Sequence, residues 1–197
     1  MKLYDISQEV FSSCVYPGDP SPEKKTLSSM KEGSHYNLTA FSMCAHNGTH
    51  VDAPAHFLLD GKTVDEIALS ATVGYATVVS HQGDVTAADA RGILENIAKC
   101  NAEAARRILI KGRATVTEGA AGFFADEGLL LLGNESQTVG PENAPMKVHK
   151  MLLGAGTVLL EGIRLEHVPD GVYLLFAAPL CLGGADGAPC RAVLATI

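Results

Sequence analysis

Three histidines and one aspartate lie within eleven residues, at His46, His50, Asp52 and His56. The whole chain of 197 residues contains only seven histidines, so packing alone is a poor explanation for this cluster. A core would have to satisfy the polar nitrogens of each ring separately. Imidazole and carboxylate groups together are the usual ligands of a catalytic zinc or a similar divalent ion. The segment therefore predicts a metal site, and a set of solvated loop histidines is the alternative.

The residues between these side chains restrict the backbone. Pro54 argues against a continuous helix, so His46 and His50 are not expected on one helical face. Gly48 allows the backbone to fold closely around an ion. In an extended segment, His50 and Asp52 point to the same side because they are two residues apart. We expect a loop or strand, with His46 and His56 closing the site from either end.

A chain of this length is typical of one domain, here residues 1–197, with a core of useful size. The 47% hydrophobic and 19% charged fractions are those of an ordinary globular protein. A net charge of −7 without a Lys/Arg cluster argues against a nucleic-acid partner. No segment approaches the roughly 18 apolar residues of a membrane-spanning helix. We expect no membrane partner.

The five cysteines are scattered and never occur in a CxxC spacing. This pattern favours reduced thiols in a cytoplasmic protein over a disulfide framework. Residues 1–35 include the turn-forming Tyr16-Pro17-Gly18-Asp19-Pro20 segment and are expected to form an N-terminal arm.

The remaining pattern alternates short apolar segments with helical ones. Strands are predicted at residues 36–43, 72–80, 107–111, 128–133, 157–160 and 172–178. Thr86 opens a helix that extends to about residue 100, and Thr117 caps a helix that Gly128 ends. Strands interleaved with two or three helices predict an α/β domain with a mixed sheet.

His149 and Glu161 form a second candidate group far along the chain. They flank an apolar run at residues 151–160. A carboxylate directly after three strongly apolar residues needs a cationic partner if it is buried. A metal ion is one such partner, and an ordinary residue at a strand end is the alternative for Glu161.

Residues 46–56 match the pattern HxGTHxDxPxH of the bacterial cyclase-type metal-dependent hydrolases, the family that contains kynurenine formamidase (arylformamidase) and isatin hydrolase. In that pattern a His and then a Glu follow far downstream, as His149 and Glu161 do here. Residues 4–7, 16–19, 160–162 and 186–192 also resemble the family, so the similarity spans nearly the whole chain.

The resemblance implies a role for each candidate residue. One ion would be bound by His46, His50 and Asp52. Asp52 would bridge to a second ion that His149 and Glu161 also hold, and His56 would donate and accept protons. The ions would be two Zn²⁺, with Mn²⁺ or Fe²⁺ as alternatives.

The resemblance also implies a fold, a reaction and an assembly. The fold would be a swivelling β/β/α arrangement, with a mixed sheet curled around the metal site and helices outside. The reaction would be hydrolysis of an amide, an aryl formamide of the N-formylkynurenine type, by a metal-activated water. The chain would then act on a small molecule in tryptophan catabolism, as a homodimer or homotetramer in which the N-terminal arm reaches a neighbour.

One departure from the family pattern concerns the substrate. Formamidases of the family carry Trp before the Pro-Gly-Asp segment, whereas this chain has no Trp and Tyr16 stands there. Tyr16 is expected to bind substrate by stacking on an aryl group, with a plain loop role as the alternative. Two other functions stay open: a ring-opening lactamase, lactonase or cyclase, and a catalytically inactive metal-binding homologue.

Overall fold

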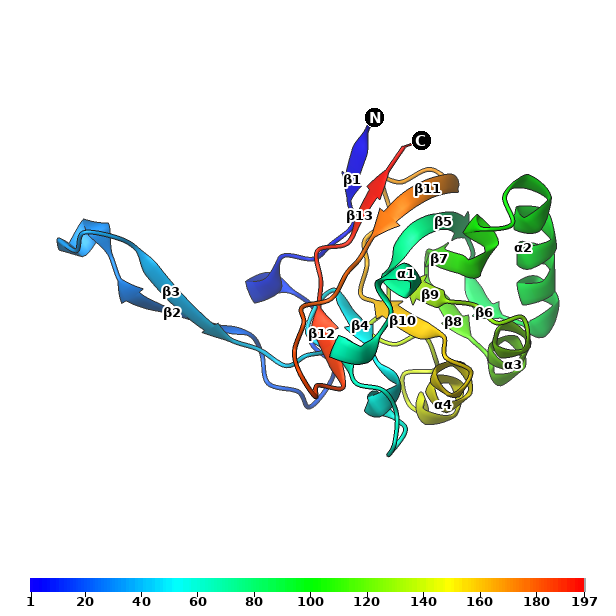
Figure 1. The fold of residues 1–197 in the computed structure, drawn as a ribbon, viewed down its shortest axis with the longest axis horizontal. Helices are drawn as coiled ribbons and strands as arrows, with labels where there is room; N and C mark the ends of the chain where they lie inside the picture. Colours follow the sequence, from blue (N-terminus) through cyan, green and yellow to red (C-terminus); the bar gives the residue numbers. More distant parts are fainter. Residues whose placement is uncertain (197) are drawn as a thin grey trace.

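A nine-stranded mixed sheet forms the centre of the fold in a computed structural model that describes residues 1–196 (Figure 1). The four strands at its middle run parallel, and the pairs on either side of them are antiparallel. In spatial order the strands are β1 (Leu3–Asp5), β13 (Val193–Ala195), β11 (Gly171–Phe176), β5 (Val73–Ser80), β7 (Arg107–Lys111), β9 (Leu131–Asn134), β10 (Val158–Glu161), β4 (His50–Asp52) and β12 (Gly187–Pro189).

The longer helices α2 (Ala87–Cys100), α3 (Glu118–Asp126) and α4 (Met146–Gly154) gather on one side of this sheet (Figure 1). Alternate residues along a strand face opposite sides, so each strand contributes to two cores. Ile108 and Leu132 pack with Phe124 of α3 on the helical side. Leu109 and Leu131 belong to the core of the other side. The fold is therefore a single α/β domain whose sheet is buried between two apolar layers.

Short elements connect these layers. A one-turn helix, α1 (Leu69–Thr72), precedes β5, and β6 (Gly83–Val85) pairs in parallel with β8 (Ala114–Val116). The described residues also contain five 3₁₀ helices: η1 (Val10–Ser12), η2 (Met30–Glu32), η3 (Pro54–His56), η4 (Val64–Glu66) and η5 (Ala104–Arg106).

A two-stranded hairpin, β2 (Glu23–Ser28) and β3 (Leu38–Ser42), projects far from the rest of the fold (Figure 1). The prediction of an arm at residues 1–35 was therefore wrong at both ends. Leu3–Asp5 pairs with Val193–Ala195 in the main sheet, and the projecting segment continues to Ser42. Pro and Gly indicated turns near residue 17, but the long-range pairing of β1 with β13 left no local signal.

Most predicted elements are present with shifted ends. Thr86 and Asp89 form the expected capping box, and Gly128 follows α3 in a left-handed conformation. The predicted α/β class with a mixed sheet is confirmed. Helix α4 was not predicted, because the apolar run at residues 151–160 is divided between the end of α4 and β10.

Two further expectations concern whole-chain properties. Within residues 1–196, none of the helices combines the length and apolar character that a membrane crossing needs. Cys14, Cys44, Cys181 and Cys190 are all free thiols, as their scattered positions predicted.

Candidate metal centre

The pairing of β4 with β10 brings the two predicted groups together. In this antiparallel register His50 lies opposite Glu161, and Asp52 lies opposite Leu159. The His50 Nε2 atom is 3.3 Å from Asp52 Oδ1 and 3.5 Å from Glu161 Oε2. His50 and Asp52 point to the same side of an extended strand, as their spacing predicted. Residues more than one hundred positions apart thus meet near one edge of the sheet.

Helix α4 supplies His149 to the same place. Its Nε2 atom is 3.2 Å from Glu161 Oε1 and 3.6 Å from Asp52 Oδ2. Its Nδ1 atom donates a hydrogen bond to the carbonyl oxygen of Pro145, and Nδ1 of His50 donates likewise to Gly48. A carbonyl only accepts, so Nδ1 carries the hydrogen in both rings and Nε2 can present a lone pair.

His46 and His56 enter from either side of β4. His46 lies in the turn before the strand, and its Nδ1 is 2.8 Å from Asp52 Oδ1. His56 ends the 3₁₀ helix η3 that begins at Pro54, and its ring stacks on that of His46 with centroids 3.9 Å apart. The backbone is a turn, a strand and a 3₁₀ helix in succession, so the sequence correctly excluded a continuous helix.

Five of these side chains form two groups that share one carboxylate. One group is His46, His50 and Asp52, and the other is Asp52, His149 and Glu161. Within each group, one candidate ligand atom per residue lies within 4.8 Å of the others. His56 belongs to neither group. These two groups contain the residues that the resemblance implied for two ions, and a third group, His46, His56 and Asp186, meets the same distance.

Asp52 supplies a direct test of whether a cation fits. Its side chain is 1% exposed, and its Oδ2 atom has no hydrogen-bond partner among the described residues. A buried carboxylate oxygen without a partner is costly unless a cation satisfies it. Nitrogen donors from three histidines and oxygen donors from two carboxylates suit Zn²⁺, Mn²⁺ or Fe²⁺. The residues present therefore fit a divalent metal centre.

The electrostatics of the cluster point in the same direction. Burial disfavours a charged His50, but hydrogen bonds to Asp52 and Glu161 outweigh it and raise the pKa of His50 to about 10. Burial likewise opposes ionisation of Asp52, yet its hydrogen bonds with His46 and His50 hold its pKa well below the usual range. The Asp52 carboxylate therefore stays ionised and favours a positive charge beside it. A bound divalent cation would supply that charge.

His46 lies in a turn that two polar side chains connect to the end of β10. Gln8 Nε2 donates to the Gly162 carbonyl at 2.7 Å, and Gln137 Nε2 donates to the Gly48 carbonyl at 2.9 Å. Gly162 has φ +69°, and a Cβ there would lie 2.2 Å from the Gly48 oxygen, so only glycine fits. Sequence reasoning did not identify Gln8 or Gln137, because single polar residues far apart carry no local signal.

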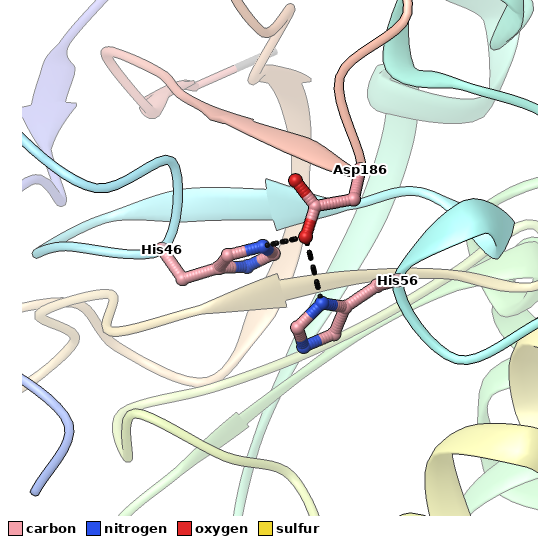
Figure 2. Close-up of side chains that lie close together, drawn as sticks. All are labelled: His46, His56 and Asp186. Carbon is pink, nitrogen blue, oxygen red and sulfur yellow. Dashed lines mark hydrogen bonds and ion pairs between the residues drawn. The ribbon is translucent and has the colours of Figure 1, made fainter. Parts of the chain in front are cut away.

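No role was predicted for Asp186. This residue precedes β12 and lies against both His46 and His56 (Figure 2). It falls inside residues 186–192, a segment that resembled the family, and an acidic residue before Gly187 was the available signal.

A cavity of about 500 Å³ opens over the cluster. His46, His50, His56, His149 and Glu161 all contribute to its wall. Tyr16 also lines it, with its hydroxyl donating to the Glu142 carbonyl at 2.8 Å. The cavity walls further include Cys44, Phe57, Gln137, Thr138 and Pro145. Five of the six predicted histidine, aspartate and glutamate side chains therefore line one cavity, and Asp52 lies beside them, 2.8 Å from His46.

The fold and the site define a metal-dependent hydrolase of the cyclase type, and comparison with known proteins agrees with this class. The model of the family described as "Putative cyclase" matches residues 4–139. The chain belongs to this family.

Full-length relatives extend the match beyond the family model. The kynurenine formamidase of Salinibacter ruber is 35% identical, over 98% of this chain and 97% of the relative. The kynurenine formamidase of Bacillus anthracis is 32% identical, over 100% and 98%. The predicted resemblance is confirmed at full length.

Solved structures share the fold. A predicted metal-dependent hydrolase from Bacillus stearothermophilus superposes with a TM-score of 0.78 at 28% identity, covering 98% of this chain and 97% of that chain. Isatin hydrolase A from Labrenzia aggregata gives a TM-score of 0.82 at 21% identity, covering 100% and 94%. The fold and the enzyme class expected from the sequence, a metal-dependent hydrolase, are confirmed.

Proposed function

We propose that this chain hydrolyses an aryl formamide of the N-formylkynurenine type, releasing formate and an aryl amine. The observation that carries the proposal is the pair of buried groups that share Asp52, with His56 beside them at the cavity. The full-length similarity to kynurenine formamidases, at 32% and 35% identity, supports the choice of substrate class. Such a reaction would belong to tryptophan catabolism, and the free cysteines support a cytoplasmic location.

Two divalent ions fit the two groups, with Asp52 shared between them. His46 and His50 would complete one site, and His149 and Glu161 the other. Bound ions of this kind polarise a carbonyl and lower the pKa of water towards about 7. The carboxylates Asp52 and Glu161 balance the charge, since two cations held close together need anionic groups between and around them.

His56 is proposed as the group that moves protons. Its side chain is 27% exposed and lines the cavity, whereas His50 and His149 beside it are buried. It would take a proton from the attacking water and deliver it to the leaving nitrogen. The amide bond breaks, the carbonyl carbon gains the water oxygen, and the nitrogen gains the proton.

Tyr16 is proposed to contact the aryl ring. It lines the cavity of its own chain, and the hydrogen bond from its hydroxyl to the Glu142 carbonyl holds the ring in place. A ring fixed at the wall can stack on a planar substrate at little entropic cost.

A panel of substrates tests the proposal. Purified protein loaded with Zn²⁺ or Mn²⁺ would be offered N-formylkynurenine, formanilide, isatin and an aryl lactone, with products identified by mass spectrometry. We expect formate release from the aryl formamides to be the fastest reaction. Preferred ring opening of isatin or the lactone would instead support a lactamase or lactonase. Metal binding without any turnover would indicate an inactive homologue.

Metal binding should release protons, because a histidine must be neutral to bind an ion. With a pKa of about 10 in the metal-free protein, His50 is protonated at pH 7 to 8. The apparent affinity for Zn²⁺ should therefore rise with pH between 6 and 8, by about tenfold per unit for each proton released. Calorimetry in two buffers of different protonation enthalpy measures this. Binding heats that do not depend on the buffer would contradict it.

We also propose that the hairpin β2–β3 joins copies of the chain into a homodimer or homotetramer. An isolated two-stranded hairpin is marginally stable in water, so this one needs a partner surface. Its large apolar side chains are exposed: Leu27, Met30, Tyr36, Leu38 and Phe41. At its base lies a groove of about 800 Å³ lined by Phe11, Phe41 and Met43, among others.

Light scattering after gel filtration tests this assembly. The wild type should elute as an oligomer, and Leu27→Lys combined with Phe41→Lys should shift it towards monomer, since charges would be buried at the contact. Leu59→Lys is the matched control, because Leu59 is fully exposed and lies outside the hairpin. A monomeric wild type would refute the proposal.

A further inference from the structure

Backbone hydrogen bonds hold the segment that contains Asp186. Its carbonyl oxygen accepts a hydrogen bond from the amide of Ala53 at 2.9 Å, directly beyond the pairing of β12 with β4. The carbonyl of Ala185 accepts another from Val64 at 2.8 Å. These two bonds tie the segment before β12 to the backbone on both sides of η3, which carries His56. The backbone of Asp186 is therefore fixed, and its side chain, 49% exposed, extends from there to both histidines.

One oxygen of Asp186 contacts two histidines at once. Its Oδ2 atom is 2.8 Å from His46 Nε2 and 3.0 Å from His56 Nδ1 (Figure 2). A carboxylate only accepts, so both of these nitrogens carry a hydrogen. His46 Nδ1 lies 2.8 Å from Asp52 Oδ1 and by the same argument carries a hydrogen. Because Asp186 holds the hydrogen of Nε2, Nδ1 is the atom that would release its hydrogen to bind an ion. His56 is left with the lone pair of Nε2 as the atom that can accept a proton.

The ring of His46 is closely packed on two sides, by Gly187 and by the ring of His56. Gly187 lies opposite Asp52 in the strand register, and a Cβ at Gly187 would come within 2.6 Å of His46 Cε1. The rings of His46 and His56 are stacked at an interplanar angle of 28°. Asp186, His46 and His56 therefore form one packed group at the wall of the cavity.

We propose that Asp186 is a positioning residue that fixes the ring orientation and the tautomer of both His46 and His56. Through His46 it would strengthen metal binding, and through His56 it would keep the proton-accepting nitrogen available for the reaction. The second half rests on the proposed hydrolase function, whereas the first requires only a metal site. Asp186 also forms a group with His46 and His56 whose ligand atoms lie within 4.8 Å, so a direct ligand role is the competing assignment.

The kinetic test uses Asp186→Ala and Asp186→Asn, each in the wild type and in a His56→Ala background, with saturating metal and an aryl formamide. Removing such a partner of a histidine typically costs about 10–100-fold, here expected in kcat with little change in KM. Asn keeps an oxygen that can accept from both rings but carries no charge, so it should restore part of the activity that Ala loses. In the His56→Ala background the further loss should be less than about 3-fold, because the ring of His56 is absent and saturating metal offsets weaker binding through His46. Equal losses in both backgrounds, or no difference between Asn and Ala, would overturn the role through His56.

The metal test needs no substrate. Competition with a chromophoric chelator should show Zn²⁺ bound about 10–100-fold more weakly by Asp186→Ala, with the same number of ions at saturation. Unchanged affinity would overturn the role through His46, and loss of an ion at saturation would show that Asp186 is a ligand. Asp60→Asn is the matched control, because Asp60 is an exposed carboxylate in the loop after His56. A wild type that binds metal but hydrolyses no formamide would refute the proposed function, while this arm would still decide the link to His46.

Discussion

Replacing His56 with alanine should lower kcat by about 10²–10⁴-fold while the protein keeps its metal, since proton transfer by a positioned side chain contributes that much. His56 stands apart from both buried groups of candidate ligands, and its side chain is 27% exposed at the cavity. Its removal should leave the donor atoms around Asp52 in place. Steady-state kinetics combined with metal analysis of the same preparation measures both effects.

His81→Ala serves as the matched control for this substitution. His81 follows β5 and donates through its ring to the Asp84 carbonyl, outside the cavity. We expect that variant to retain wild-type turnover. Loss of metal and activity in equal measure from the His56→Ala variant would show that His56 is a ligand and would refute its proton-transfer role.

Replacing Asp52 with asparagine should abolish both metal binding and turnover. Asp52 is the one residue common to the two groups, and its carboxylate is buried with an oxygen that lacks a protein partner among residues 1–196. A neutral amide removes the charge that holds the cations together. Loss of several kcal/mol of stabilisation by bound ions corresponds to a fall in rate of about 10³-fold or more.

Glu161→Gln is the informative comparison for Asp52→Asn. Glu161 belongs to only one group, and its Oε1 atom accepts a hydrogen bond from the amide of Val139 that a glutamine oxygen can also accept. We expect this variant to stay folded and to retain about one ion per chain where the wild type binds about two. Metal analysis after dialysis distinguishes the variants. Identical metal loss from both would contradict the sharing of Asp52, and circular dichroism checks that each variant is folded.

Local signals predicted the local structure well. Thr86 and Asp89 satisfy the first turn of α2 with their own side chains, so the helix start is encoded within four residues. The strand at residues 107–111 is short, apolar and bounded, and β7 has those bounds. By contrast, the apolar run at residues 151–160 contains the end of a buried helix and a buried strand. Hydrophobic periodicity does not separate these two structures over so short a span.

The part of the site that lies close together in sequence could be predicted, and Asp186, which strand pairing adds to it, could not. His46, His50, Asp52 and His56 are close in sequence, so their chemistry was apparent from spacing alone. Asp186 meets them only because β12 pairs with the far edge of β4. Such neighbours depend on strand order, which a single sequence does not encode locally. The hairpin pairs neighbouring segments of the chain, but its first strand, residues 23–28, was missed because it is polar and exposed and has no alternating apolar pattern.

The central claim is that the residues around Asp52 form a metal-dependent hydrolytic centre, and metal removal followed by stepwise reconstitution tests it most directly. Formate release from an aryl formamide would be followed in protein stripped with a chelator and then titrated with Zn²⁺ or Mn²⁺. The stripped protein should be inactive, and activity should return and saturate at about two ions per chain. Turnover that survives complete removal of metal would contradict the account.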